Sequence, residues 1–148
     1  MSPNRARHRA RDLLVKALYQ RQAADHGFDE LVEQFAETRE YAGADQQYFR
    51  ELLRIVLEET PELDVAISRY AVRGIDQLDE VGRGILRLAF AELRHRPDVP
   101  AKVVINEAVE LAKRYGATDT FRFVNAVLDK AAKEGRSGAA PRRAPGSD

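Results

Sequence analysis

The chain has 148 residues, a length that allows one domain whose core buries about two-thirds of the surface exposed by the unfolded chain. It contains no cysteine, which excludes disulfides, thiolate metal sites and a cysteine nucleophile and fits a reducing compartment. Its 24 basic and 24 acidic side chains balance, and because neither a membrane span nor a secretory signal is visible, we expect a cytoplasmic protein.

Apolar residues recur at helical spacing through the first half of the chain. They predict helices over about 9–24, from Phe28 to Ala36, over 44–60, and from Pro61 to near Gly74. The segment 44–60 has a broad apolar face, which suggests that it is the central helix. Thr60 is expected to be the N-cap of the following helix, because the missing amide hydrogen of Pro61 costs nothing at a first helical position.

The second half of the chain continues the helical pattern. Helices are predicted from Val81 to Leu93, from Pro100 to a stop at Gly116, and from an N-cap at Thr118 or Asp119 to about Glu134. Gly82 and Gly84 fall in the first turns of the fifth helix, where each costs about 1 kcal/mol relative to alanine. These two glycines therefore indicate close packing or fraying.

No alternating apolar pattern or hairpin signal is visible, so the predicted fold class is all-α, with about seven helices in one or two compact bundles. We expect a single helical domain over residues 1–134, with two subdomains of roughly 1–75 and 76–134. Residues 135–148 contain no large apolar side chain and are predicted to form a disordered tail.

The charges are segregated along the chain although they balance overall. Residues 1–16 carry 5 basic side chains against 1 acidic one, residues 17–80 carry 6 against 15, and residues 81–148 carry 13 against 8. Two basic ends that flank an acidic middle suit a protein that binds an anion at one place and another partner elsewhere.

The last helix contains two phenylalanines only two positions apart, which point about 200° from each other. If Val124 marks the centre of its buried face, Phe121 lies within about 60° of that centre and Phe123 about 100° away. We therefore predict that Phe121 belongs to the core. Phe123 is predicted to lie on an exposed surface with Asp119 and Lys130, and with Arg122 and Lys133 further round.

An exposed ring beside cations favours single-stranded RNA, because bases gain about 1–3 kcal/mol each by stacking on aromatic side chains while cations bind the phosphates. Asp119 could accept a hydrogen bond from a base amino group. The alternative is that Phe123 packs against a neighbouring helix and that the lysines only solubilise the protein.

The N-terminal segment supports the RNA interpretation. Arg5, Arg7, Arg9 and Arg11 occur at every second residue, with His8 between them. Cations at a helix N-terminus oppose the helix dipole, so helix stability does not explain them, whereas ordering on a phosphate backbone does. A solvated polar tail remains the alternative.

Three further polar residues have ordinary interpretations. Tyr19 lies one step off the apolar stripe of its helix, so it is either an interface residue or a half-buried core tyrosine. Asn106 and Asn125 are within predicted helices, where the default expectation is a structural hydrogen bond between helices or helix ends.

Five segments stand in a distinctive order: "RHRARDLLVKALYQ", "YFRELL", "GILRLAFAEL", "DVPAKVVINEAVELAKRYG" and "DTFRFVNAVLDKAAK". Through them the chain resembles the NusB family of transcription antitermination factors over about residues 5–134. The resemblance implies an all-helical fold of two small bundles, without catalysis, cofactor or metal. It also implies binding to boxA RNA of ribosomal RNA leaders together with NusE, a small-subunit ribosomal protein, in a complex that keeps RNA polymerase from terminating.

The family's functional positions can be carried over to this chain. The resemblance places RNA-binding residues at Arg7, Arg9 and Arg11, with His8 where a relative has arginine, and at Asp119, Arg122 and Phe123. It implies an acidic residue for the NusE contact near the start of the fifth helix. This chain has Gly82 there, so the contact is expected to shift to neighbours such as Glu80 and Arg83, with Tyr19 as a further candidate.

Other function classes have weaker support. An RNA-binding module like that of rRNA cytosine methyltransferases would lack its catalytic domain here, and a helical adaptor that binds only proteins would use the acidic middle. His8, His26 and His95 show no metal-ligand spacing, and no nucleophile or phosphate-loop motif occurs, so an enzyme is not expected. Whether the protein is a monomer or a homodimer stays open.

Overall fold

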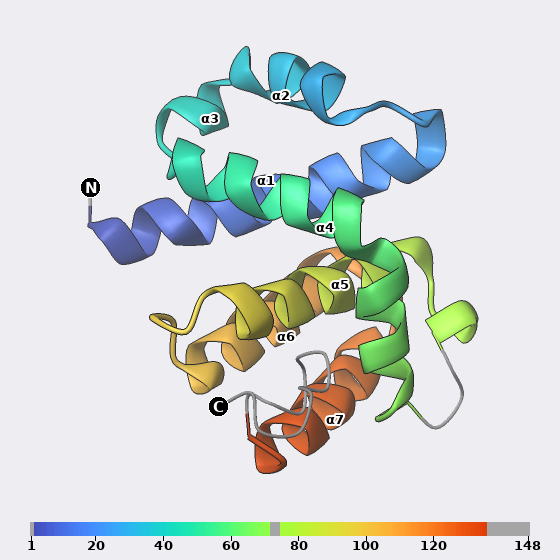
Figure 1. Cartoon of the computed structure of the whole chain (residues 1–148). Coiled ribbons are helices and arrows are strands. Elements are labelled where there is room, and N and C mark those ends of the chain that lie inside the picture. The colour runs from blue at the N-terminus through green and yellow to red at the C-terminus, as the bar shows by residue number, and fades with distance from the viewer. Residues whose placement is uncertain (1, 72–74, 136–148) are drawn as a thin grey trace, which may run out of the picture.

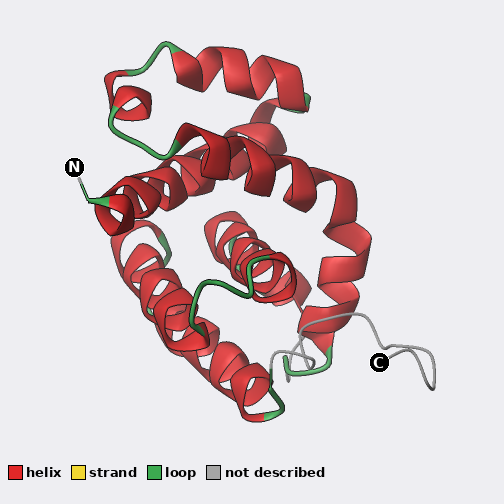
Figure 2. Cartoon of the chain, turned by 60° about the vertical axis from the view of Figure 1, so that its left-hand side comes forward, coloured by secondary structure: helices red, strands yellow, loops and turns green. Residues whose placement is uncertain are grey.

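The computed structural model describes residues 2–71 and 75–135 (Figure 1). These residues form α-helices joined by short loops and contain no strand, which confirms the predicted all-α fold (Figure 2). The helices are α1 (Pro3–Ala24), α2 (Phe28–Ala36), α3 (Arg39–Ala42), α4 (Gln46–Ser68), α5 (Glu80–His95), α6 (Ala101–Tyr115) and α7 (Thr120–Lys133), with a 3-10 helix η1 (Ile75–Gln77) before α5. The helix stop predicted near Gly74 and the tail predicted for 135–148, Gly135 excepted, lie outside the described residues.

Helix α1 begins six residues earlier than the apolar pattern predicted. The side chain of Ser2 is its N-cap and accepts a hydrogen bond from the backbone N–H of Arg5 (3.2 Å), and Pro3 occupies the first helical position. The N-terminal arginines are therefore part of a regular helix, which fixes the direction in which each one points.

Helix α4 spans both of the helices predicted on either side of Pro61. The two segments are joined by a kink at Glu59, whose backbone is not helical (φ −110°, ψ 18°). Thr60 is not an N-cap, because its hydroxyl donates a hydrogen bond back to the carbonyl of Val56 (2.7 Å). The described residues also contain seven α-helices, but they are not the seven that were predicted. Two predicted helices are merged into α4, and the short α3 was not predicted.

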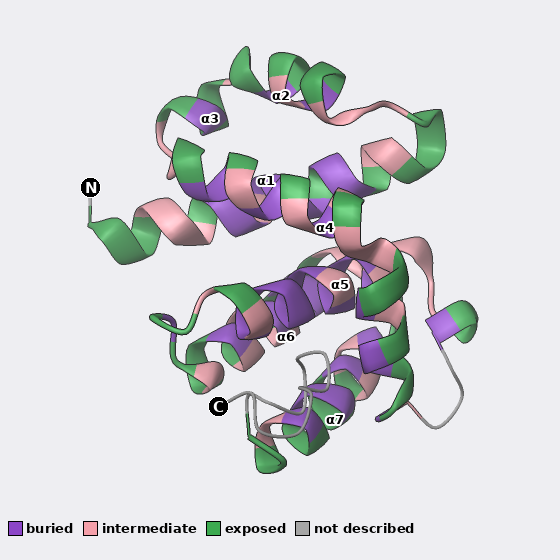
Figure 3. Cartoon of the chain, viewed as in Figure 1, coloured by how far each residue is buried: buried purple, intermediate pink, exposed green. Residues whose placement is uncertain are grey.

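Helix α5 is the central helix, so the prediction that 44–60 has this role is wrong. Helix α5 packs against α1, α4, α6 and α7, while α2 and α3 lie on the outer side of α1 and α4 (Figure 1). Ten of its 16 residues are buried, against eight of 23 in α4. Figure 3 shows buried positions along nearly the whole of α5, whereas most positions of α2 and α3 are exposed to solvent.

The two glycines of α5 allow its neighbours to approach closely. A Cβ atom at Gly82 would lie 2.9 Å from Cγ2 of Thr120 in α7, closer than real side chains tolerate. At Gly84 it would lie 3.5 Å from Cβ of Leu18 in α1, which is an ordinary contact. The sequence indicated either close packing or fraying at these glycines, and close packing is what the structure shows. The contact of α7 with Gly82 depends on the missing side chain more than the contact of α1 with Gly84 does.

The interior joins both halves of the chain. Helix α5 contacts α1 and α4 on one side and α6 and α7 on the other, so the predicted subdomains of roughly 1–75 and 76–134 share a continuous core. The division into two subdomains itself stays a prediction. No helix within the described ranges combines the length and the apolarity that crossing a bilayer requires.

Candidate nucleic-acid interface

The carboxylate of Asp79 fixes the turn that leads into α7. Its Oδ1 accepts hydrogen bonds from the backbone N–H of Gly82 (3.3 Å) and from the hydroxyl of Thr120 (3.1 Å), and its Oδ2 accepts one from the N–H of Ala117 (3.3 Å). Asp79 is thus the N-cap of α5 and at the same time an anchor for residues 117–120. The start of α7 is held to the central helix by side-chain hydrogen bonds as well as by packing.

Asp119 and Arg122 stand on the outside of this anchored turn. Asp119 is the N-cap residue of α7, but its side chain makes no capping hydrogen bond and its backbone is left-handed (φ 72°). Instead its Oδ1 lies 3.3 Å from Nε of Arg122, and the two side chains are 68% and 75% exposed. Such a pair is worth about 0–1 kcal/mol, so Arg122 is readily available to another anion.

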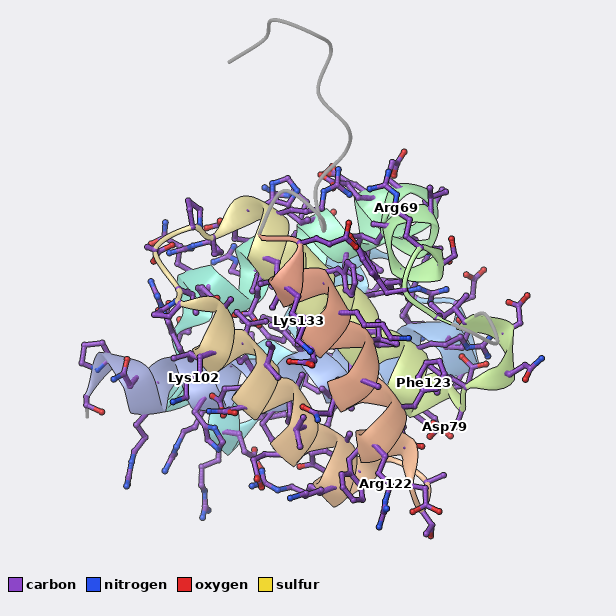
Figure 4. All side chains as sticks on the ribbon, turned by 90° about the horizontal axis from the view of Figure 1, so that it is seen from below. Arg69, Asp79, Lys102, Arg122, Phe123 and Lys133 are labelled. Atoms are coloured by element: carbon purple, nitrogen blue, oxygen red, sulfur yellow. The ribbon has the colours of Figure 1, made fainter. Side chains whose placement is uncertain are left out.

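The two phenylalanines of α7 are both half-buried, so the prediction of one core ring and one exposed ring is wrong. They lie at opposite edges of a broad buried face, where each ring is only partly covered. Phe121 faces α6, and Figure 4 shows Phe123 on the other side of α7, the side of Asp79. The alternative in which Phe123 packs against a neighbouring segment is therefore partly realised.

The combination of a ring with cations, which was predicted at Phe123, occurs instead at Phe121. Lys113 Nζ lies 5.2 Å and Arg122 Cζ 5.4 Å from the centre of its ring. Lys130 is also exposed, but it belongs to the last turn of α7 and is separated from Phe121 by more than two helical turns.

The N-terminal arginines do not form one ribbon of cations, because residues two apart on a helix point in nearly opposite directions. Arg5 and Arg9 are exposed, and Arg9 faces the loop before α4, where its Nη1 lies 2.7 Å from where a Cβ of Gly43 would be. Arg7 and Arg11 turn toward the protein instead.

Arg7 is half-buried and engaged in ion pairs. Its Nη1 lies 3.1 Å from Oδ2 of Asp98, and its guanidinium carbon lies 4.6 Å from the ring centre of Tyr48. A hydrogen bond from Arg96, reinforced by the one from Arg7, holds the pKa of Asp98 well below its usual range. Asp98 is therefore ionised at neutral pH and competes with any phosphate for Arg7.

Arg11 is buried, which corrects the prediction that it lies on the RNA-binding surface. Its Nε donates to Oε1 of Glu92 (2.9 Å) and its Nη1 to Oε1 of Glu107 (2.9 Å), while the hydroxyl of Tyr48 also donates to Glu92. Burial alone would lower the pKa of Arg11, but the charge and hydrogen bonding of Glu92 outweigh it and raise that pKa. Arg11 is a residue that positions α1 on α5 and α6.

His8 extends this network toward the surface, with its Nδ1 2.9 Å from Oε2 of Glu107 on α6. One turn further along α1, Asp12 accepts hydrogen bonds from the hydroxyl of Tyr115 (2.8 Å) and from Nη1 of Arg114 (2.9 Å). Tyr115 ends α6, directly before the turn into α7. The end of α6 therefore links the N-terminal helix to the Asp119–Arg122 region.

Sequence reasoning missed the two exposed cations at this link, Lys16 and Arg114. Lys16 Nζ lies 3.4 Å from Oδ2 of Asp12, and the hydrogen bond with Asp12 raises the pKa of Arg114. The i,i+4 spacing of Asp12 and Lys16 was a usable signal for their pairing. No local signal could have brought Arg114 to Asp12, because 102 residues separate them.

The candidate partner residues lie elsewhere. Tyr19 is 51% exposed, so the alternative of a half-buried core tyrosine is wrong. Glu80 and Arg83 pair with each other in the first turn of α5, and Glu80 lines a small cavity of about 240 Å³ between α1, α4 and α5. The absence of an acidic side chain at Gly82 has a packing reason, because Thr120 and Asp79 fill that space.

Comparison with known proteins gives consistent matches. A model of the NusB family matches residues 8–133. A transcription antitermination protein NusB of Alcanivorax borkumensis is 43% identical over 140 residues, covering 95% of this chain and 93% of the relative. That of Pseudoalteromonas atlantica is 48% identical over 128 residues, covering 86% and 91%.

Solved structures agree with these relatives. NusB of T. maritima superposes with a TM-score of 0.73 at 34% identity, covering 85% of this chain and 91% of that one. A chain in a crystal structure of the antitermination factors NusB and NusE in complex with dsRNA superposes with a TM-score of 0.68 at 29% identity, covering 88% and 98%.

Proposed function

This chain belongs to the NusB family, and from that premise we propose that it is an RNA-binding transcription antitermination factor. It binds a boxA-like element of ribosomal RNA leaders together with NusE. In doing so it helps to assemble an antitermination complex on RNA polymerase. We expect it to act in the cytoplasm and without catalysis of its own.

The observation that carries this proposal is the exposed Asp119–Arg122 pair at the anchored start of α7. Its turn is fixed by Asp79, so a ligand bound there meets a surface that is already ordered and loses little binding energy to ordering it. Arg122 supplies a cation for a phosphate, and Asp119 supplies an acceptor for a base amino group.

The N-terminal helix contributes to the same function in two ways. Arg5 and Arg9 are exposed cations that can bind phosphates, and Arg11 holds the helix in place through Glu92 and Glu107. Removing Arg11 would therefore weaken RNA binding by disordering the surface. Arg7 and His8 are less available for RNA than Arg5 and Arg9, because each would have to give up its contact with a carboxylate before it could bind a phosphate.

For the NusE contact we propose the first turn of α5 and the exposed face of α1. Glu80, Arg83 and Tyr19 supply an acidic, a basic and an aromatic group there. The structural neighbour that contains NusB, NusE and dsRNA supports both partners. Because Gly82 leaves no room for a side chain, Glu80 is the acidic group proposed to take part.

The test is fluorescence anisotropy with a labelled boxA-like RNA, a scrambled RNA and a duplex, each with and without NusE and over a range of salt concentrations. We expect salt-dependent binding of the boxA-like strand that NusE strengthens, because the partner adds contacts to the same RNA. Binding to NusE without any RNA affinity would instead identify the protein as an adaptor. Equal affinity for the three RNAs would contradict the proposal that the protein recognises a boxA-like sequence.

A further inference from the structure

A groove of about 620 Å³ runs between α6 and α7 beside the Asp119–Arg122 pair. This volume is in the range of about 300–1,000 Å³ that is typical of ligand clefts. The polar and aromatic side chains that line it are Asn106, Glu110 and Lys113 of α6 and Phe121, Arg122 and Asn125 of α7. Figure 4 shows the two helices side by side, with Arg122 at one end of the pair and Lys102 and Lys133 toward the other.

The two asparagines of this groove contradict the expectation that they make structural hydrogen bonds. Both are exposed, and neither side chain has a hydrogen-bond partner within residues 2–71 and 75–135. Each amide offers a carbonyl acceptor and two N–H donors to the groove. Two unpaired amides on facing helices form a surface suited to a ligand edge that carries both donors and acceptors.

Phe121 adds an aromatic platform to the amides. One part of its ring is packed on the core, and the remainder faces the groove near Lys113 and Arg122. Both cations are exposed, so either can leave the ring for a phosphate at little cost. Glu110, on the same wall, has its Oε1 3.9 Å from Nζ of Lys113, so it already pairs with that lysine and repels a phosphate brought close to it. Arg122, whose partner Asp119 does not line the groove, is therefore the cation better placed for a phosphate, and an uncharged polar group fits along the asparagines.

We propose that this α6–α7 groove binds one nucleotide of a single-stranded RNA. Its base stacks on Phe121, its edge is hydrogen-bonded by Asn125 and Asn106, and its phosphate is held by Lys113 or Arg122. This assignment rests on the proposed function and deepens it, because it names a subsite that recognises a base. A nucleotide fits the groove better than an acidic peptide does, since stacking and amide pairing satisfy groups that a carboxylate would leave unused.

The groove is continuous with the surface assigned to RNA. Arg122 belongs to both, because it pairs with Asp119 on the outside of the turn and approaches Phe121 at the groove. An RNA strand that contacts Asp119 can therefore place the adjacent nucleotide between α6 and α7 without leaving an unbound nucleotide in between. The groove walls are helices fixed on the core through Ala108, Leu111, Val124 and Leu128, so the subsite exists before RNA arrives.

The test measures the affinities of protein variants for the boxA-like RNA and for versions of that RNA that each lack a single base. The proteins are the wild type, Phe121→Leu, Asn125→Ala and the control Gln34→Ala, which removes an exposed amide from the distant α2. On intact RNA we expect Phe121→Leu to weaken binding about 5- to 100-fold. Asn125→Ala should weaken it about 3- to 10-fold, and Gln34→Ala by less than twofold.

One abasic position should abolish the effects of both groove variants, because the base they contact is then missing. Asn125 is exposed and Phe121→Leu keeps an apolar side chain, and melting curves of both variants will establish that they fold. Groove variants that bind every RNA as the wild type does would overturn this inference and leave the proposed function intact. Loss of NusE binding with normal RNA affinity would also overturn it, and a wild type without RNA affinity would overturn both.

Discussion

Arg11 and Glu92 form an ion pair inside the protein, with Nη2 of the arginine 2.9 Å from Oε1 of the glutamate and exposures of only 3% and 2%. The pair joins α1 to the central helix α5 across 81 positions of sequence. Tyr48 of α4 and Glu107 of α6 complete it, so four helices meet at one buried polar cluster. Each member satisfies another, which is the condition under which buried charge is tolerated.

Removing one member of this cluster should destabilise the fold strongly. We expect Arg11→Ala to lower the free energy of unfolding by about 3–5 kcal/mol, because Glu92 is left buried without its countercharge. Arg9→Ala, on the exposed side of the same helix, should change it by less than about 0.5 kcal/mol. Urea denaturation of both variants checks this, and equal stabilities would show that the pair is not structural.

The stability should depend on Tyr48 in alkaline solution. Burial, followed by the charge of Glu92, raises the pKa of Tyr48 well above its usual value of about 10. The folded state therefore keeps this proton more firmly than the unfolded state, so the contribution is complete below pH ~10 and is lost as pH rises beyond it. The difference in unfolding free energy between the wild type and Tyr48→Phe should begin to shrink above about pH 10 and keep shrinking as the pH rises toward the higher pKa of the folded state. A constant difference would contradict the assignment.

The two glycines of α5 should respond oppositely to alanine. Gly82→Ala places a methyl group 2.9 Å from Thr120 Cγ2 and 2.8 Å from Asp79 Oδ1, so we expect a loss of about 1–3 kcal/mol despite better helix propensity. Gly84→Ala meets Leu18 at 3.5 Å and should be neutral or stabilising by about 0.5–1 kcal/mol. Thermal melting of the pair provides a matched comparison. A harmless Gly82→Ala would mean that α7 does not depend on this contact.

Exposed cations should set the salt dependence of RNA binding. With about five phosphate contacts, the slope of log affinity against log salt is expected near −3.5, or roughly a hundredfold loss between 50 and 200 mM. Arg5→Ala and Arg122→Ala should each make the slope shallower by about 0.7, because each removes one contact. A variant that weakens binding without changing the slope is acting through something other than phosphate.

Phe123→Ala should affect both RNA binding and stability, since the ring is half-buried on the side of α7 near Asp79 (Figure 4). We expect a loss of about 1–3 kcal/mol in RNA binding and about 1–2 kcal/mol in unfolding free energy. Phe123→Leu separates the two effects, because it keeps apolar contact and removes the aromatic face. If Phe123→Leu binds RNA as tightly as the wild type, the ring has no stacking role.

The apolar stripes were sufficient to predict an all-α chain, because each stripe is a local property of 10–20 residues. The exposure or burial of each N-terminal arginine, by contrast, is not a local property of the sequence. Their directions depended on a helix start set by Ser2, and the burial of Arg11 depended on Glu92 and Glu107, which only the folded chain brings near. The alternation of arginines was visible in the sequence, but the division into outward and inward members was not.

The same limit explains the two rings of α7. Their angular separation was predicted correctly, yet burial depends on how far the neighbouring helices extend around α7, which one helix does not reveal. The free amides of Asn106 and Asn125 were missed for a related reason, since asparagine in a helix is more often a structural residue. The unpaired groups became visible only when α6 and α7 were seen side by side.

The triple hydrogen bonding of Asp79 has a consequence for genetic work on this protein. One carboxylate caps the N-terminus of the helix that carries Glu80 and Arg83 and also holds the turn that carries Asp119. A lesion at Asp79 would loosen both surfaces together, so its phenotype would not report on either interaction alone. Separation-of-function alleles should be sought at outward-facing positions that make no such double attachment.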